Sequence, residues 1–146
     1  MTKNNVLLIA VVVALAAAYV IWFTDWFKPA TVQIFHVSRN VARRAQSSEA
    51  LPGLIFGLNR PLKITEIKLV PLDEFQTNRN ILPLWHLVSD SNSVPLKAFT
   101  YGANIRGLHP AVKGTRPQAL ATNTVYRLLV TAGNIKGQHD FSLDGQ

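Results

Sequence analysis

Histidines are the residues of this sequence best suited to bind a metal or to move a proton, but their spacing predicts no site. There are four, and no two of them follow an HxH or HxxxH pattern: His36, His86, His109 and His139. A metal site would therefore need ligands from distant parts of the chain. His36 and His86 lie in apolar segments, where we interpret them as hydrogen-bonded residues of a sheet.

Other catalytic patterns are absent from the sequence. It contains no GxSxG motif, no phosphate-binding Walker loop, no GxGxxG motif and no cysteine. Asp73 and Glu74 are adjacent, but no acid–base partner is evident, so we interpret them as solvated surface residues. The sequence predicts a non-catalytic protein without an intrinsic cofactor, a metal or a small-molecule substrate.

Basic residues carry more information. Lys and Arg number 15 against 8 Asp and Glu, which gives a net charge of +7. Two groups in predicted loops are candidate contacts for a partner or for lipid: Arg39, Arg43 and Arg44, and Arg106, Lys113 and Arg116. Because these loops lack the aromatic residues of a nucleic-acid platform, we expect acidic protein surfaces or anionic headgroups as partners, and no nucleic acid. Alternatively, the cations only keep an apolar domain soluble.

The first element that would position these residues is an apolar segment near the N-terminus. Residues 6–23 contain no charge, glycine or proline, and together with residues 24–27 they would form a helix of roughly 33 Å. This length spans a bilayer core. Four aromatic residues near its end are predicted membrane-interface anchors: Tyr19, Trp22, Trp26 and Phe27.

Two alternatives remain for this segment, and its orientation follows from charge. Lys3 and the run Ala16-Ala17-Ala18 resemble a cleaved signal peptide, although apolar residues continue to Phe23. A buried helix of a soluble protein is the other alternative.

The positive tail predicts a cytoplasmic N-terminus and a periplasmic or otherwise extracytoplasmic C-terminal domain, although the arginines after the helix weigh against this orientation. The segment has no histidine to ligate a pigment, but contact with lipid or with a pigment shared with neighbouring subunits remains open.

Beyond residue 29, short β-rich segments alternate with turn signals. We divide the chain into a cytoplasmic tail (1–5), a transmembrane helix (6–27), a juxtamembrane strand with a basic loop (28–52), and the rest of a β domain (53–146). The expected strands are 31–38, 53–58, 62–70, 84–89, 94–101, 124–132 and 138–143. The strand 94–101 is expected at a sheet edge because of Pro95.

Several connections between these strands are also predicted. We expect a turn at 59–61 and a connection with charged and amide residues over 71–83. Near Thr65 the alternation changes parity, which indicates either a β-bulge or a strand with both faces partly covered. Residues 102–122 are predicted to form a long loop, and residues 133–137 a five-residue hairpin connection. The result is a two-sheet β-sandwich. Trp85 in a central strand, Tyr126 at the start of the penultimate strand and the final hairpin favour an immunoglobulin-like version, with Trp85 and Tyr126 in the core.

These features predict a single-pass accessory subunit that stabilises a multi-subunit membrane protein complex. Its helix and its loops 39–52 and 102–122 would contact neighbouring subunits. A photosynthetic or respiratory host is expected from the abundance of such complexes, not from a motif. The alternative is an independent membrane-anchored binding module for a peptide, a lipid headgroup or an envelope component.

Overall fold

The computed structural model describes residues 2–23, 30–39, 53–91 and 93–143, and its first element is a long apolar helix. Helix α1 spans Lys3–Phe23, and none of its residues is buried. It is long and apolar enough to cross a membrane, a test that a signal sequence near the N-terminus also passes. The apolar helix is thus confirmed, and it begins three residues before the predicted span. Residues 24–27 of that span lie outside the described residues.

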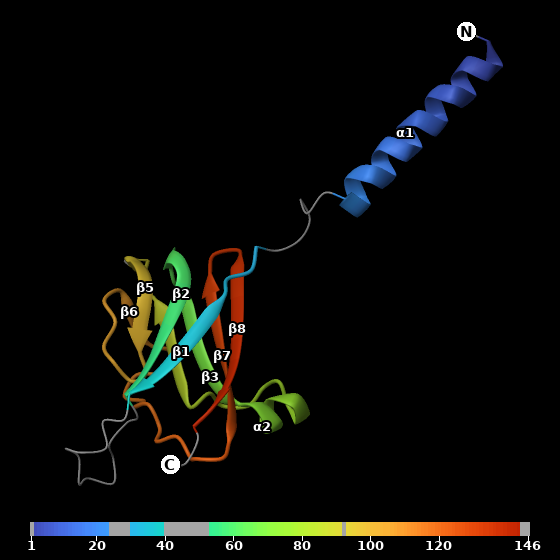
Figure 1. Cartoon of the computed structure of the whole chain (residues 1–146). Coiled ribbons are helices and arrows are strands. Elements are labelled where there is room, and N and C mark those ends of the chain that lie inside the picture. Colours follow the sequence, from blue (N-terminus) through green and yellow to red (C-terminus); the bar gives the residue numbers. More distant parts are fainter. Residues whose placement is uncertain (1, 24–29, 40–52, 92, 144–146) are drawn as a thin grey trace.

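Two antiparallel sheets pack together to form the β domain, as the sequence predicts (Figure 1). The three-stranded sheet has the order β1-β2-β5, and its strands are β1 (Ile34–Arg39), β2 (Gly53–Lys63) and β5 (Pro95–Thr100). The five-stranded sheet has the order β6-β4-β3-β7-β8, and its strands are β3 (Glu66–Pro71), β4 (Trp85–Ser89), β6 (Leu108–Pro110), β7 (Val125–Ala132) and β8 (Ile135–Ser142). Strand β5 lies at a sheet edge, as Pro95 predicts.

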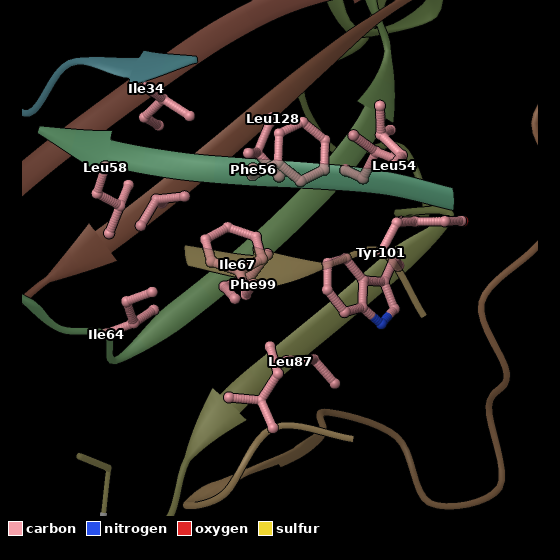
Figure 2. Packing of buried hydrophobic residues seen from close by; sticks show 14 of the residues in the cluster. Ile34, Leu54, Phe56, Leu58, Ile64, Ile67, Leu87, Phe99, Tyr101 and Leu128 are labelled. Atoms are coloured by element: carbon pink, nitrogen blue, oxygen red, sulfur yellow. The ribbon is translucent and has the colours of Figure 1, made fainter. Parts of the chain in front are cut away.

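Alternation along the strands places the core between the two sheets. Leu54, Phe56 and Leu58 of β2 are fully buried, and the inward residues of β7 face them from the other sheet. Figure 2 shows Phe56 among these apolar side chains, and its ring centroid lies 5.6 Å from that of Phe99 and 5.2 Å from that of Phe141. Trp85 and Tyr126 are also buried, which confirms the prediction that both belong to the core.

The chain enters the β domain beside the turn between β7 and β8. Thr31 forms a parallel bridge with Lys136, and the N–H of Val32 donates to the Lys136 carbonyl. A Cβ at Gly137 would lie 2.3 Å from a methyl carbon of Val32, so glycine is needed for this close approach. We call this end of the domain the entry end; the starts of β1, β3 and β8 lie there. The far end, opposite, carries helix α2 (Leu72–Thr77) and the start of β4 (Figure 1).

The predicted strand 62–70 is instead divided between the two sheets. Leu62 and Lys63 end β2, and Glu66 begins β3. Between them, Ile64 is buried, and both the N–H and the hydroxyl of Thr65 donate to the Thr131 carbonyl, at 2.8 and 3.0 Å. The change of parity therefore marks the passage from one sheet to the other, and the β-bulge, one of the two explanations considered, is wrong.

The predicted turn at 59–61 is also wrong, because β2 continues to Lys63. Gly57 pairs with Ala98 and Leu62 pairs with Leu96, so four residues of β2 lie opposite Lys97 alone. Pro61 cannot donate a backbone hydrogen bond, and an irregular stretch tolerates it. The turn-forming residues thus disturb the pairing without reversing the chain.

Two more connections differ from the expectations, and the connection 71–83 contains a short helix that was not predicted. The segment 71–83 contains α2. Asp73 and Glu74 lie in its first turn, where their negative charges interact favourably with the helix dipole. The predicted loop 102–122 contains the short strand β6. The hairpin between β7 and β8 has a two-residue connection, in which Gly133 has a φ of 63°. Gly137 lies within β8, where it faces Val32 and does not extend the turn.

Candidate functional site

A cavity of about 620 Å³ lies between β4 and the segment 102–118. This volume falls within the range of pockets that hold small molecules or peptide side chains. Apolar side chains make up much of its lining: Leu82, Leu84, Trp85, Leu87, Ile105, Leu108 and Val112. The cavity is therefore suited to an apolar group.

Two backbone hydrogen bonds, one to β4 and one to Leu84 just before it, shape the outer wall of this cavity. The N–H of Ala111 donates to the His86 carbonyl at 3.1 Å, and the N–H of Gln118 donates to the Leu84 carbonyl at 3.2 Å. Residues 112–117 protrude from the sheet edge between these two points. Within this protrusion the hydroxyl of Thr115 donates to the Val112 carbonyl at 2.6 Å, which closes a compact turn.

Exposed apolar side chains mark the mouth of the cavity. Val112 and Leu82 both line the cavity, and they are 64% and 90% exposed. Both lie toward the far end of the domain, because Leu82 precedes β4 and Val112 follows β6. Exposed apolar groups beside a preformed cavity are typical of a surface that binds a partner.

Hydroxyl groups of two buried tyrosines bond to the last part of the segment 102–122. The hydroxyl of Tyr101 donates to the Gln118 carbonyl at 2.6 Å. Burial raises the pKa of Tyr101, as does Tyr126 nearby, so this hydroxyl remains a donor. The hydroxyl of Tyr126 accepts from the N–H of Ala121 at 2.7 Å and donates to its carbonyl at 3.3 Å. These bonds fix the cavity wall in place.

The structure separates the predicted basic contacts. Arg116 lines the cavity, and Lys113 lies in the same protruding turn. Arg106 precedes β6 at the entry end, so β6 separates it from the other two. Arg39 is the last residue of β1, near the far end. Arg43 and Arg44 lie outside the described residues, as does almost all of the predicted contact loop 39–52.

The predicted membrane-interface anchors are described only in part. Tyr19 and Trp22 are exposed on α1, and the ring of Tyr19 stacks on that of Phe23 with centroids 5.2 Å apart. Trp26 and Phe27 lie outside the described residues. The described pair thus lies near the end of the apolar helix, where an interfacial anchor is expected.

Three of the four histidines form pairs that sequence spacing did not reveal. His36 Nδ1 lies 2.8 Å from His139 Nε2, across the seam between β1 and β8. His86 Nε2 lies 2.8 Å from Glu66 Oε1, and Lys68 Nζ contacts the same oxygen at 2.8 Å. Burial alone would raise the pKa of Glu66, but hydrogen bonds from Lys68 and His86 outweigh it and lower the pKa.

These pairs do not assemble into a metal centre. Within the described ranges, no group of three histidine, aspartate or glutamate residues could hold a metal ion. The fourth histidine, His109, is exposed on β6 opposite Val88. Pairing of β3 with β4 brings His86 near Glu66, and contact between the two sheets brings His36 near His139, so only the fold reveals the two pairs.

The pair of His36 and His139 predicts that acid weakens the β domain. Burial and the nearby His36 lower the pKa of His139 from 6.5, although Asp140 acts in the opposite direction. The unfolded chain then binds this proton at a higher pH than the folded chain. The free energy of unfolding should therefore fall as the pH drops below about 6.5. Thermal unfolding of the detergent-solubilised chain, followed between about pH 7.5 and 5, measures this fall.

A matched pair of variants identifies the source of this pH dependence. His139→Asn should reduce the fall, whereas His109→Asn on the exposed strand β6 should leave it unchanged. Asp140 does not interfere in this range, because its hydrogen bond with Arg127 lowers its pKa and delays its protonation to more acidic pH. An equal fall in the wild type and in His139→Asn would contradict the prediction.

No protein-family model matches the chain, and no curated protein or solved structure is significantly similar to it. Functional inference therefore depends on the residues and contacts of this chain.

Proposed function

We propose that this protein is a membrane-anchored, non-catalytic subunit whose β domain docks a segment of a neighbouring membrane protein in the cavity beside β4. The anchor is supported by α1, because 21 residues of helix span roughly 31 Å and none of them is buried against the β domain. An exposed apolar helix finds a favourable environment in lipid. In this proposal the β domain lies on the extracytoplasmic side, and a photosynthetic or respiratory complex is the proposed host.

We further propose that the β domain is an immunoglobulin-like sandwich. The order β1-β2-β5 corresponds to strands A, B and E of that fold, and the order β4-β3-β7-β8 to strands C′, C, F and G. The hydroxyl of Tyr126, near the start of β7, bonds to the backbone of Ala121, as the tyrosine corner of that fold does. Trp85 does not support the assignment, because it lies on β4 and not on β3.

The observation that carries the docking proposal is the apolar mouth of the cavity. Leu82 and Val112 expose large apolar side chains at a preformed cavity whose lining includes the buried Trp85. Lys113 and Arg116 lie in the same protruding turn, so an apolar segment with acidic neighbours has the complementary chemistry. A neighbouring subunit can supply such a segment.

Charged residues at the mouth should disrupt docking. We expect Leu82→Glu combined with Val112→Glu to weaken association with the host complex by at least about 30-fold, the size of a single interface hot spot. Both side chains are exposed, so the fold should be retained. The assay is recovery of the tagged full-length chain from native membranes in mild detergent, followed by native electrophoresis and identification of co-purifying proteins.

Val37→Glu is the matched control, because Val37 is also exposed and apolar but lies on the three-stranded sheet. It should remain in the complex. Migration of the wild-type chain as a free monomer would contradict the subunit proposal. If that monomer retained a peptide only when Leu82 and Val112 were intact, the independent binding module would be favoured.

A further inference from the structure

Five basic side chains gather at the entry end of the β domain. Lys136 is the first exposed residue of β8. Lys63 is the last residue of β2 and pairs with Pro95, and Lys97 lies opposite the irregular stretch of β2. The other two are Arg60, within that stretch, and Arg106, just before β6. All five are exposed. We refer to them as the entry-end cations: Arg60, Lys63, Lys97, Arg106 and Lys136.

Carboxylates do not neutralise this group. Among the described residues, none of the five forms an ion pair. Two acidic residues share the entry end, Glu66 and Asp90, and the carboxylate of Glu66 is already bonded to Lys68 and His86. The acidic residues of α2, in contrast, lie at the far end. The described part of the β domain therefore carries a group of unpaired cations where the chain enters it.

Covalent geometry keeps the entry end close to α1. Seven peptide steps join Phe23 to Ala30, and a chain of this length spans at most about 25 Å. The chain is then fastened to the domain by the bridge between Thr31 and Lys136. If α1 spans a membrane, as proposed above, the start of the β domain lies no more than about 25 Å from the end of the helix at the headgroups.

We propose that the entry-end cations dock the β domain onto anionic phospholipid headgroups. This inference rests on the proposed membrane anchor. Cations attract an anionic bilayer within about one Debye length, roughly 10 Å at 0.1 M salt, and a tether of at most about 25 Å allows them to reach that range. Such docking orients the β domain with its entry end on the lipid, and the mouth of the cavity at Leu82 and Val112 points away from the surface.

Because the chain has no cysteine, a single introduced cysteine gives a unique label for the test. Asn134→Cys places a fluorescent donor at the entry end, and Ala119→Cys places one at the far end; both residues are exposed. The labelled full-length chain is reconstituted into phosphatidylcholine vesicles containing an acceptor lipid, with or without phosphatidylglycerol. We expect energy transfer from position 134 to rise with phosphatidylglycerol and to fall in high salt, whereas transfer from position 119 does not rise.

Neutral substitutions identify the residues responsible. Lys63→Gln, Lys97→Gln and Lys136→Gln together should lower the ratio of docked to undocked domain on the order of a hundredfold, about fivefold for each cation. The matched control, Lys113→Gln with Arg116→Gln, removes two cations from the far end and should keep the full response. Equal thermal unfolding of both variants and the wild type verifies that the fold is retained.

Failure of this inference and failure of the anchor are distinguishable. A wild-type chain that resists carbonate extraction but shows no response to phosphatidylglycerol overturns this inference alone. The same holds if the Lys113 and Arg116 variant loses as much response as the lysine variant, or if position 119 approaches the lipid instead of position 134. Release of the uncleaved chain by carbonate overturns both the anchor and this inference.

Discussion

Substitution of Val12 and Val13 by arginine should remove the chain from the membrane. Both side chains lie midway along α1 and are more than half exposed, so no protein contact shields the new charges. One arginine at the centre of a transmembrane helix costs about 2.5–3.5 kcal/mol on insertion scales, so two should cost about 5–7 kcal/mol. The readout is the fraction of full-length chain that stays in the pellet after alkaline carbonate extraction.

The control for this experiment places the same charges at the polar start of the helix. Asn4→Arg with Asn5→Arg should leave membrane insertion intact, because these residues lie next to Lys3 at the aqueous boundary. Retention of the Val12 and Val13 variant in the pellet would contradict a transmembrane α1. Mass spectrometry of the mature wild-type chain tests the signal sequence separately, since cleavage after Ala18 would remove most of α1.

Phe56→Ala should destabilise the β domain by about 3–5 kcal/mol, the typical cost of deleting a fully buried phenylalanine. Phe56 is fully buried, and its ring contacts Phe99 of its own sheet and Phe141 of the opposite sheet. The substitution therefore leaves a cavity between the sheets. Denaturant unfolding followed by the fluorescence of buried Trp85 measures the loss.

Phe35→Ala is the matched control, because it removes the same ring from an exposed position in the same sheet. Phe35 is 54% exposed and lies over Gly57. We expect its free energy of unfolding to fall by less than half as much as that of Phe56→Ala. Equal losses for the two variants would show that the core does not lie between the sheets.

Local alternation was enough to predict most strands. The run around Leu128 and Val130 alternates buried and outward residues, and it forms β7 as expected. Residues 84–89 and 94–101 differ from β4 and β5 by one residue at the ends. The change of sheet at Ile64 and Thr65 could not be predicted, because a bulge and a sheet crossing produce the same change of parity in the sequence.

The candidate site was predictable only in part, since its geometry depends on pairing between distant residues. The segment 102–122 was expected to make contacts, and it forms one wall of the cavity. The cavity itself depends on hydrogen bonds from Ala111 and Gln118 to β4 and to Leu84 just before it, which no local pattern encodes. Proximity in sequence also misled the grouping of charges: β6 separates Arg106 from Lys113, whereas Lys63 and Lys136 share one end of the domain.

The way in which the chain enters the domain determines how the protein resists mechanical force. The first residues of the domain are hydrogen-bonded to β8, and β1 then runs antiparallel to β2 over six paired residues. A pull along β1 from the membrane side acts parallel to the strands and loads these hydrogen bonds in shear, all at once. The domain should therefore withstand tension on its tether better than a fold in which the first strand can be peeled away one bond at a time.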